Sequence, residues 1–300
     1  MTRHPGSAAT EADGCVGGEA GWDAAAGVGG IGSELRAARM VLKREMLHFV
    51  RDRARSAVVL LQPLLFLFVL GVGLSRLIEG VGGGSAPDYL IFLFPGVLVM
   101  SVQAPAISVG ASIVWDRQSG FLREMLVAPV RRSTLLIGKC VGGACVATVQ
   151  GLVVLACAGL VGIPYHLDLI LLLTAQLALT ALAMTALGAV VAVTIRRLQT
   201  FNTVLSLMMT PLIFLSGLMF PISAMPGWVS ALSLFNPLTY AVDALRRTIT
   251  GRLLDHAPSA LFDPVSWGSW IPPAPAEIAV VIAFTAGALA YASRRFAQIG

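Results

Sequence analysis

Long apolar runs separated by short polar loops make up most of the chain between Ser56 and Ala292. A helix needs about 20 apolar residues to cross a hydrocarbon core of ~30 Å. Five runs reach that length, and a shorter sixth can cross if Glu277 and Arg294 extend to the two interfaces. We expect spans at about 56–78, 89–114, 140–163, 169–195, 201–220 and 276–293. The sequence therefore predicts an all-α polytopic membrane protein with six transmembrane helices.

Composition supports one membrane domain over residues 34–295. Hydrophobic residues make up 56% of the chain and charged residues 12%, whereas a soluble protein has roughly half apolar and about a quarter charged residues. Residues 1–33 are rich in Gly and Ala, with too few large apolar groups to offset the entropy of ordering, so we expect a disordered tail. The glycine string from Gly27 to Gly32 matches a dinucleotide fingerprint, but no βαβ pattern surrounds it.

Basic and apolar residues occupy different faces of a helix expected to begin at Glu34, with Ser33 as its N-cap. Such a helix can lie on the inner membrane surface, with its cations near anionic headgroups. A helix that packs on a partner is the alternative. The apolar positions are Leu35, Ala38, Leu42, Met46 and Phe49, and the basic positions include Arg39, Arg44 and Arg51.

Lys and Arg concentrate on every second loop, whereas loops 79–88 and 164–168 contain neither. The positive-inside rule therefore predicts cytoplasmic termini. The excess of Arg over Lys is typical of GC-rich bacterial genomes, so we expect the bacterial inner membrane. Basic residues that flank apolar spans also argue against a nucleic-acid partner. The inner cations are Arg36, Arg39, Lys43, Arg44, Arg51, Arg53, Arg55, Arg117, Arg123, Arg131, Arg132, Lys139, Arg196, Arg197, Arg294 and Arg295.

The long segment 221–275 does not agree with the positive-inside rule, because six spans place Arg246, Arg247 and Arg252 outside. A hidden crossing at 228–245 is the alternative. Asn236 and Pro237 have the pattern of an N-cap and a first helical residue. The helix that they open places Leu238, Ala241, Leu245 and Ile249 on one face, and Asp243 can pair with Arg246 on another. This half-polar pattern favours short helices that re-enter the outer leaflet, between spans five and six.

The stretch from Trp115 to Lys139 resembles the cytoplasmic signature loop of ABC-2 type transporter permeases, most of all the daunorubicin-resistance-like drug-exporter branch. Its pattern is an acidic residue, a glycine, a short helix, a proline and a basic residue that opens the next span. Here these are Asp116, Gly120, Phe121 to Ala128, Pro129 and Lys139. A second resemblance, to the outer re-entrant motif of the family, is carried by Ser216, Gly217, Phe220, Pro221, Met225, Pro226, Trp228, Asn236, Pro237, Tyr240, Asp243 and Arg246.

The resemblance implies that the loop is a coupling helix, docked in a cleft of an ATP-binding subunit. Its apolar edge supports this, because a helix of about two turns is unstable alone in water and needs a docking surface. A plain basic connector is the alternative. The implied coupling residues are Asp116, Gly120, Phe121, Leu122, Glu124 and Pro129.

This chain lacks a phosphate-binding loop: Gly138 and Lys139 are followed by Cys140, and no glycine lies five residues before Gly138. We therefore expect no cofactor in this chain and no catalytic site of its own. The four cysteines lack metal-ligand spacing, so no metal is expected. The resemblance implies a homodimer or heterodimer of permeases within membrane lipids, above ABC nucleotide-binding subunits that bind ATP and Mg.

Ionisable residues are absent from the five long spans away from their ends, which argues against proton coupling. Gln62, Gln103, Asn202 and Thr210 are candidates for a translocation path, although helix–helix hydrogen bonding is their commoner role. The sequence predicts a permease that exports a hydrophobic or amphipathic compound, with ATP hydrolysed in a separate subunit. Polysaccharide or lipid export is an alternative within the family, and an ATP-independent channel or assembly protein lies outside it. An embedded enzyme would need clustered His, Asp or Glu.

Overall fold

The computed structural model describes residues 53–73, 86–119, 132–253, 262–267 and 270–298. The tail 1–33 and the amphipathic segment with Arg39, Arg44 and Arg51 lie outside the described residues. In the described part of the chain the regular elements are helices, and the one strand-like pairing is an isolated bridge between Trp267 and Trp270. This confirms the all-α class. The elements are α2 (Arg53–Leu65), η2 (Phe66–Leu70), α4 (Ala86–Gln118), α6 (Arg132–Leu155), η3 (Ala158–Val161), α7 (Leu167–Thr194), α8 (Leu198–Leu215), η4 (Ile222–Ala224), α9 (Gly227–Ser233), α10 (Pro237–Leu253) and α11 (Ala274–Ala297).

Among the described residues, five helices are long and apolar enough to cross a membrane, which makes this a polytopic membrane protein. A shorter apolar helix, Ala57–Gly73, coincides with the first expected span, so the count of six stays a prediction. Two helices end earlier than we expected. The chain leaves α6 at Leu155 for a 3-10 turn that closes at Gly162, and it leaves α8 just before Gly217. Both glycines have positive φ, which other residues rarely adopt.

Helices α4 and α7 form the centre of the bundle. Of their most apolar windows, 72% and 67% are buried, against 17% and 22% for α8 and α11. Small residues allow the two central helices to approach closely, as is usual between membrane helices. A β-carbon on Gly110 of α4 would lie 2.6 Å from the carbonyl oxygen of Gly188 in α7. The outer helices therefore present most of their apolar surface away from the protein core.

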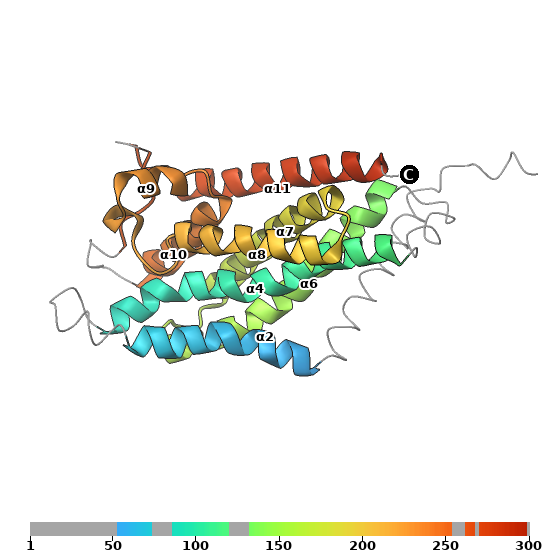
Figure 1. Ribbon diagram of the computed structural model, residues 1–300. Coiled ribbons are helices and arrows are strands. Elements are labelled where there is room, and N and C mark those ends of the chain that lie inside the picture. Colours follow the sequence, from blue (N-terminus) through green and yellow to red (C-terminus); the bar gives the residue numbers. More distant parts are fainter. Residues whose placement is uncertain (1–52, 74–85, 120–131, 254–261, 268–269, 299–300) are drawn as a thin grey trace, which may run out of the picture.

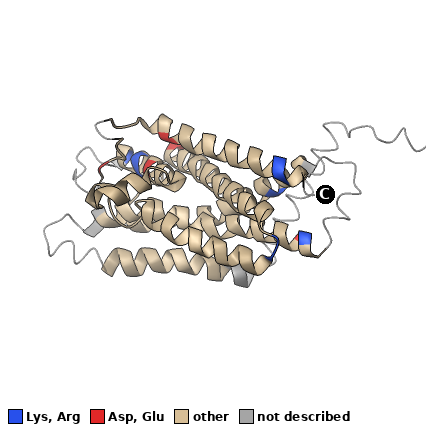
Figure 2. Cartoon of the chain, turned by 45° about the horizontal axis from the view of Figure 1, so that its top comes forward, with Lys and Arg blue, Asp and Glu red and all other residues tan. Residues whose placement is uncertain are grey.

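The long helices run side by side, so the bundle has two ends (Figure 1). We call the end where α4 finishes and α6 begins the hairpin end, and α11 finishes there too. The opposite end, the cap end, carries α9, α10 and residues 262–267 and 270–273. Since α8 finishes and α11 begins at the cap end, no continuous helix forms the alternative crossing at 228–245. In the part of the chain that the structure describes, charged residues gather at the two ends and leave the middle of the bundle uncharged (Figure 2).

Candidate functional site

At the hairpin end a buried ion pair joins α4 to α6. The Lys139 ammonium contacts the carboxylate of Asp116 and also donates a hydrogen bond to the Ser112 hydroxyl at 3.0 Å. Asp116 and Lys139 are both buried. We call Ser112, Asp116 and Lys139 the hairpin-end clasp. It brings together the acidic and basic residues that bound the predicted coupling loop, whereas Gly120, Phe121, Leu122, Glu124 and Pro129 lie outside the described residues.

The clasp fixes geometry more than it adds net stability. Burying two charges costs desolvation free energy, which their attraction repays only when the geometry is good. Removing one partner leaves the other charge buried without compensation, which costs roughly 3–5 kcal/mol. The pair therefore holds the ends of α4 and α6 in one relative position, on either side of the loop that connects them.

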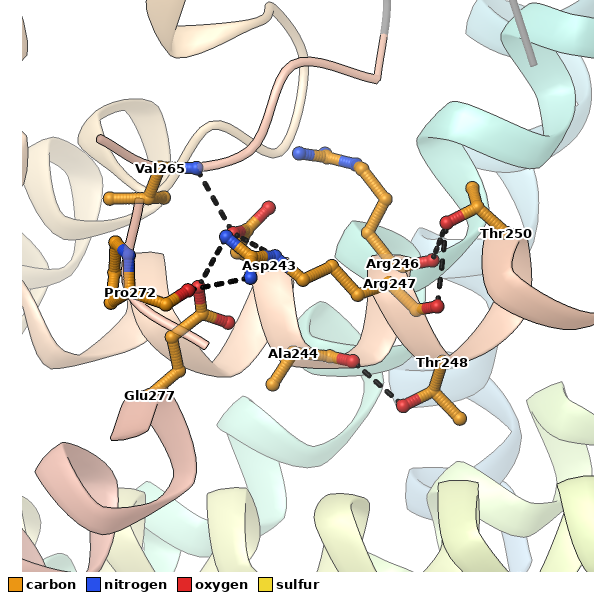
Figure 3. A network of polar contacts seen from close by, with 9 residues as sticks. All are labelled: Asp243, Ala244, Arg246, Arg247, Thr248, Thr250, Val265, Pro272 and Glu277. Atoms are coloured by element: carbon orange, nitrogen blue, oxygen red, sulfur yellow. Dashed lines mark hydrogen bonds and ion pairs between the residues drawn. The ribbon is translucent and has the colours of Figure 1, made fainter. Parts of the chain in front are cut away.

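At the cap end Arg247 lies between two carboxylates (Figure 3). Its Nε donates to Oδ2 of Asp243 at 3.1 Å, and its Nη1 donates to the Pro272 carbonyl at 2.7 Å. Its Nη2 lies 2.9 Å from Oε1 of Glu277, as an ion pair that is not aligned as a hydrogen bond. Asp243 Oδ2 also accepts from the Val265 amide at 3.1 Å. Arg247 thus connects α10 to the first turn of α11 and to the residues before it (262–267 and 270–273), which we call the return segment.

Two expectations for this end were wrong. Glu277 does not extend towards water, because its side chain is fully buried against Arg247. Asp243 pairs with Arg247 one turn along the helix, and the expected pair with Arg246 is not formed. The Arg246 side chain instead reaches the residues after α8 and the ring of Phe92 in α4. There it donates to the Gly217 carbonyl at 2.8 Å and lies 3.9 Å from the ring centre of Phe92.

Arg246 stays cationic in this setting. Burial lowers its pKa to about 10, and the nearby Asp243 charge opposes that shift. The guanidinium is therefore protonated at neutral pH and can form both the hydrogen bond and the cation–π contact. Because its two partners belong to α4 and to the residues after α8, Arg246 holds α10 to the centre of the bundle. We call Asp243, Arg246, Arg247 and Glu277 the cap-end network.

The start of α10 also closes the end of α8. Asn236 caps α10 as expected, since its Oδ1 accepts from the Leu238 amide at 3.0 Å. Its Nδ2 donates to the Leu212 carbonyl at 2.7 Å, and Thr239 donates to the Leu215 carbonyl at 3.1 Å. Those carbonyls lie in the last turn of α8, which lacks partners within its own helix. Of the other residues in the predicted outer motif, Pro237 begins α10 and Pro221 precedes η4.

The four candidates for a translocation path differ in burial and come from three helices. Gln103 is buried in α4, whereas Gln62, Asn202 and Thr210 are exposed on α2 and α8. The Thr210 hydroxyl donates to the Ser206 carbonyl of its own helix at 3.1 Å. Among the described residues no hydrogen bond joins any two of the four. Their role in translocation stays a prediction.

Sequence reasoning missed two residues of the cap-end network, Arg247 and Glu277. The signal for Arg247 was present, because Asp243 and Arg247 have the four-residue spacing of a helical ion pair. Glu277 carried a weaker signal, as an acid in the first turn of an apolar helix. Its partner lies 30 positions earlier on another element, so only the folded chain connects them.

A bundle of long apolar helices, with charges confined to its ends, defines an integral membrane protein of the multi-pass class. The more specific assignment comes from known sequences. Residues 36–250 match the family described as ABC-2 type transporter, and this chain belongs to that family.

Relatives of this chain include transport permeases and nodulation proteins. Nodulation protein J of Rhizobium leguminosarum bv. trifolii is 30% identical over 194 residues, which are 64% of this chain and 72% of that protein. The putative transport permease ycf38 of Cyanophora paradoxa is 26% identical over 210 residues, 69% and 72% of the two chains. The inner membrane transport permease YadH of Escherichia coli (strain K12) is 25% identical over 217 residues, 72% and 83% of the two chains. The chain is therefore a membrane transport permease, and these relatives do not single out the drug-exporter branch.

Proposed function

We propose that this chain is the transmembrane subunit of an exporter that is driven by ATP hydrolysis in a separate ABC nucleotide-binding subunit. The observation that carries the proposal is the hairpin-end clasp. Burying an ion pair at the base of one loop costs desolvation free energy. Its presence there is explained if a partner pushes or pulls on that loop, because the ion pair then passes the movement to α4 and α6. Family membership adds support, since ABC-2 permeases normally work with an ABC ATPase.

In this proposal the loop after α4 is the coupling helix, with Asp116 at its base. Gly120, Phe121, Leu122, Glu124 and Pro129 supply the surface that the nucleotide-binding subunit grips. The loop then faces the cytoplasm, as do both termini, and the chain resides in the bacterial inner membrane. ATP and Mg are bound by the partner. When the partner closes around ATP, it shifts the helix bundle from one packing to another. The size of this shift is limited by the difference between the affinities of the two states for ATP.

A second permease chain, identical or paralogous, completes the pathway. Support comes from the outer helices, which expose large apolar side chains in the described structure. Leu207 and Phe214 of α8 are 75% and 53% exposed, and Ile282 of α11 is 51% exposed. Such surface must be covered by lipid or by another protein chain. The middle of the bundle, which is uncharged in the described part of the chain (Figure 2), suits the passage of a hydrophobic or amphipathic compound.

The experiment is to express the chain with an ABC ATPase encoded beside it, purify the complex and reconstitute it in liposomes. We expect co-purification, stimulation of ATP hydrolysis by the permease, and ATP-dependent movement of daunorubicin as a hydrophobic probe. An ATPase variant without its phosphate-binding lysine is the control for ATP dependence. A chain that binds no ATPase and conducts the probe without ATP would instead be a channel.

A separate measurement tests the orientation. A single cysteine placed at Gly120, in a background where the four native cysteines are replaced, is exposed to an impermeant thiol reagent in intact cells. We expect labelling only after the inner membrane is opened. Labelling in intact cells would place the loop outside and end the proposal.

A further inference from the structure

An apolar cavity of about 250 Å³ lies at the cap end, between the last turn of α6, the η3 turn and the first turns of α7. Leu155, Ala158 and Leu173 form its buried floor, and Ala156 and Tyr165 lie exposed at its rim. The cavity is larger than the engineered cavity of roughly 150 Å³ that takes up benzene in another protein. It is therefore large enough for a ligand of several heavy atoms. The remaining lining residues are Leu152, Ile163, Pro164, Leu169 and Ile170.

The chemistry of the lining restricts the ligand to an apolar group. Tyr165 carries the one polar side-chain atom among the lining residues, and that atom is already used. Its hydroxyl donates to the Ala156 carbonyl at 2.5 Å and accepts from the Gly159 amide at 2.8 Å. A ligand with polar groups would lose its hydrogen bonds to water without replacement, which is costly. A saturated hydrocarbon chain loses nothing in this way.

The surroundings of the cavity indicate where such a chain comes from. Leu160 in η3 and Leu167 and Leu171 in α7 are 71%, 74% and 61% exposed, so the same elements present large apolar side chains outwards. In a polytopic membrane protein that surface faces the acyl region of the bilayer. At about 30 Å³ for a group the size of water or methylene, the cavity holds on the order of eight methylenes. This is a substantial part of one lipid chain.

We infer that this cavity is a binding site for one acyl chain of a phospholipid from the leaflet at the cap end. The site lies between α6 and α7 and does not include the clasp or the cap-end network. The acyl chain fills the space above Leu155, Ala158 and Leu173, and the headgroup stays at the interface beyond Tyr165. The inference does not depend on ATP or on the exported compound.

The test uses the full-length chain in nanodiscs of phosphatidylethanolamine and phosphatidylglycerol. A phosphatidylethanolamine with a photoactivatable diazirine midway along one acyl chain is added, and a palmitate with the same group is used in a parallel sample. After illumination, labelled peptides are identified by mass spectrometry. We expect lipid labelling to concentrate in residues 152–173 and to saturate, whereas the exposed surface of α8 around Leu207 is labelled weakly and in proportion to probe concentration.

Variants that fill the cavity provide the decisive comparison. Ala156→Trp and Ile170→Trp each place an indole in the cavity, and labelling of residues 152–173 should fall to the level of the α8 surface. Ala286→Trp, at an exposed alanine of α11, is the matched control and should leave labelling unchanged. Gel filtration and thermal midpoints confirm that the variants are folded. Even labelling of all apolar surfaces, unchanged labelling in folded cavity variants, or labelling by palmitate alone would each overturn the inference.

Discussion

The two ends of the bundle handle buried charge in different ways. The hairpin-end clasp uses one acid and one base on consecutive long helices, with a serine as a third partner. The cap-end network uses two arginines and two acids and reaches α4, the end of α8, α10, the return segment and α11. The clasp therefore fixes the two helix ends that flank one loop, whereas the network fixes several elements that are distant in sequence.

This difference indicates which end is free to move as a unit. A paired contact between two neighbours lets α4 and α6 shift together without breaking other charged contacts. At the cap end, any displacement of α10 must disturb Arg246 on one side and Arg247 on the other. Buried charges are retained only when they are paired, so breaking the larger network costs more. We expect the hairpin end to transmit movement and the cap end to resist it.

The largest effect should come from Arg247→Met. This change leaves Asp243 and Glu277 buried together without their shared cation, so we expect a loss of stability near the upper end of roughly 3–5 kcal/mol. Thermal unfolding of the purified chain in detergent measures it, and the yield of folded protein should fall in parallel. Arg294→Met, at an exposed arginine of the opposite end of α11, is the control. Equal thermal midpoints for the two variants would show that the cap-end network stabilises the protein no more than an exposed arginine does.

The second effect concerns the clasp. Lys139→Met leaves the Asp116 carboxylate buried and unpaired, and we expect a loss near the lower end of roughly 3–5 kcal/mol, because the pair has fewer partners to disturb. The double change Asp116→Lys with Lys139→Asp restores an ion pair and should regain most of the midpoint. The apolar pair Asp116→Leu with Lys139→Met should also be stable.

These clasp variants also separate positioning from stability. If the clasp transmits movement, the apolar pair folds well yet stimulates the partner ATPase less than the wild-type chain does. The charge-reversed pair should stimulate it more than either single variant. Full stimulation by the apolar pair would show that the clasp only fills space.

A smaller effect is expected from Asn236→Ala, which tests whether the cap end depends on more than charge. The variant loses the cap of α10 and the hydrogen bond to the Leu212 carbonyl. The expected loss is about 1–2 kcal/mol, as for other N-cap residues. Asn202→Ala, at an exposed position of α8, changes the same side chain without these contacts and should leave the thermal midpoint in place. If Asn236→Ala has the same thermal midpoint as this control, the arginines alone hold α10 in place.

Much of the fold could be predicted from sequence, because length and apolarity alone identify membrane helices. Local chemistry also predicted the start of α10 correctly, since an N-cap asparagine before a proline needs no distant partner. The bounds of α6 and α8 were less accurate. Both end in turns at Gly162 and Gly217, and an apolar run does not reveal where the backbone changes conformation.

The candidate site was predicted only in part, because its pairings depend on distant elements. Asp243 has arginines at both three and four residues along the helix, and either spacing permits a pair. The other contacts of each arginine decide which one pairs with Asp243. Arg246 binds the Gly217 carbonyl and the ring of Phe92, whereas Arg247 pairs with Glu277. Those partners come from other helices, so no local pattern contains them. The coupling and translocation roles of the predicted residues stay predictions.

The smallest effect is expected at the ion pair between Arg252 and Asp168, which also lies at the cap end but belongs to neither the clasp nor the network. Its side chains are 52% and 55% exposed, so water screens the attraction and solvates either partner left alone. We expect Arg252→Met to leave the thermal midpoint within experimental scatter, at low and at high salt. A change in thermal midpoint close to that of Arg247→Met would contradict this expectation. It would mean that the cost of losing a charge depends on its location at the cap end and not on its burial.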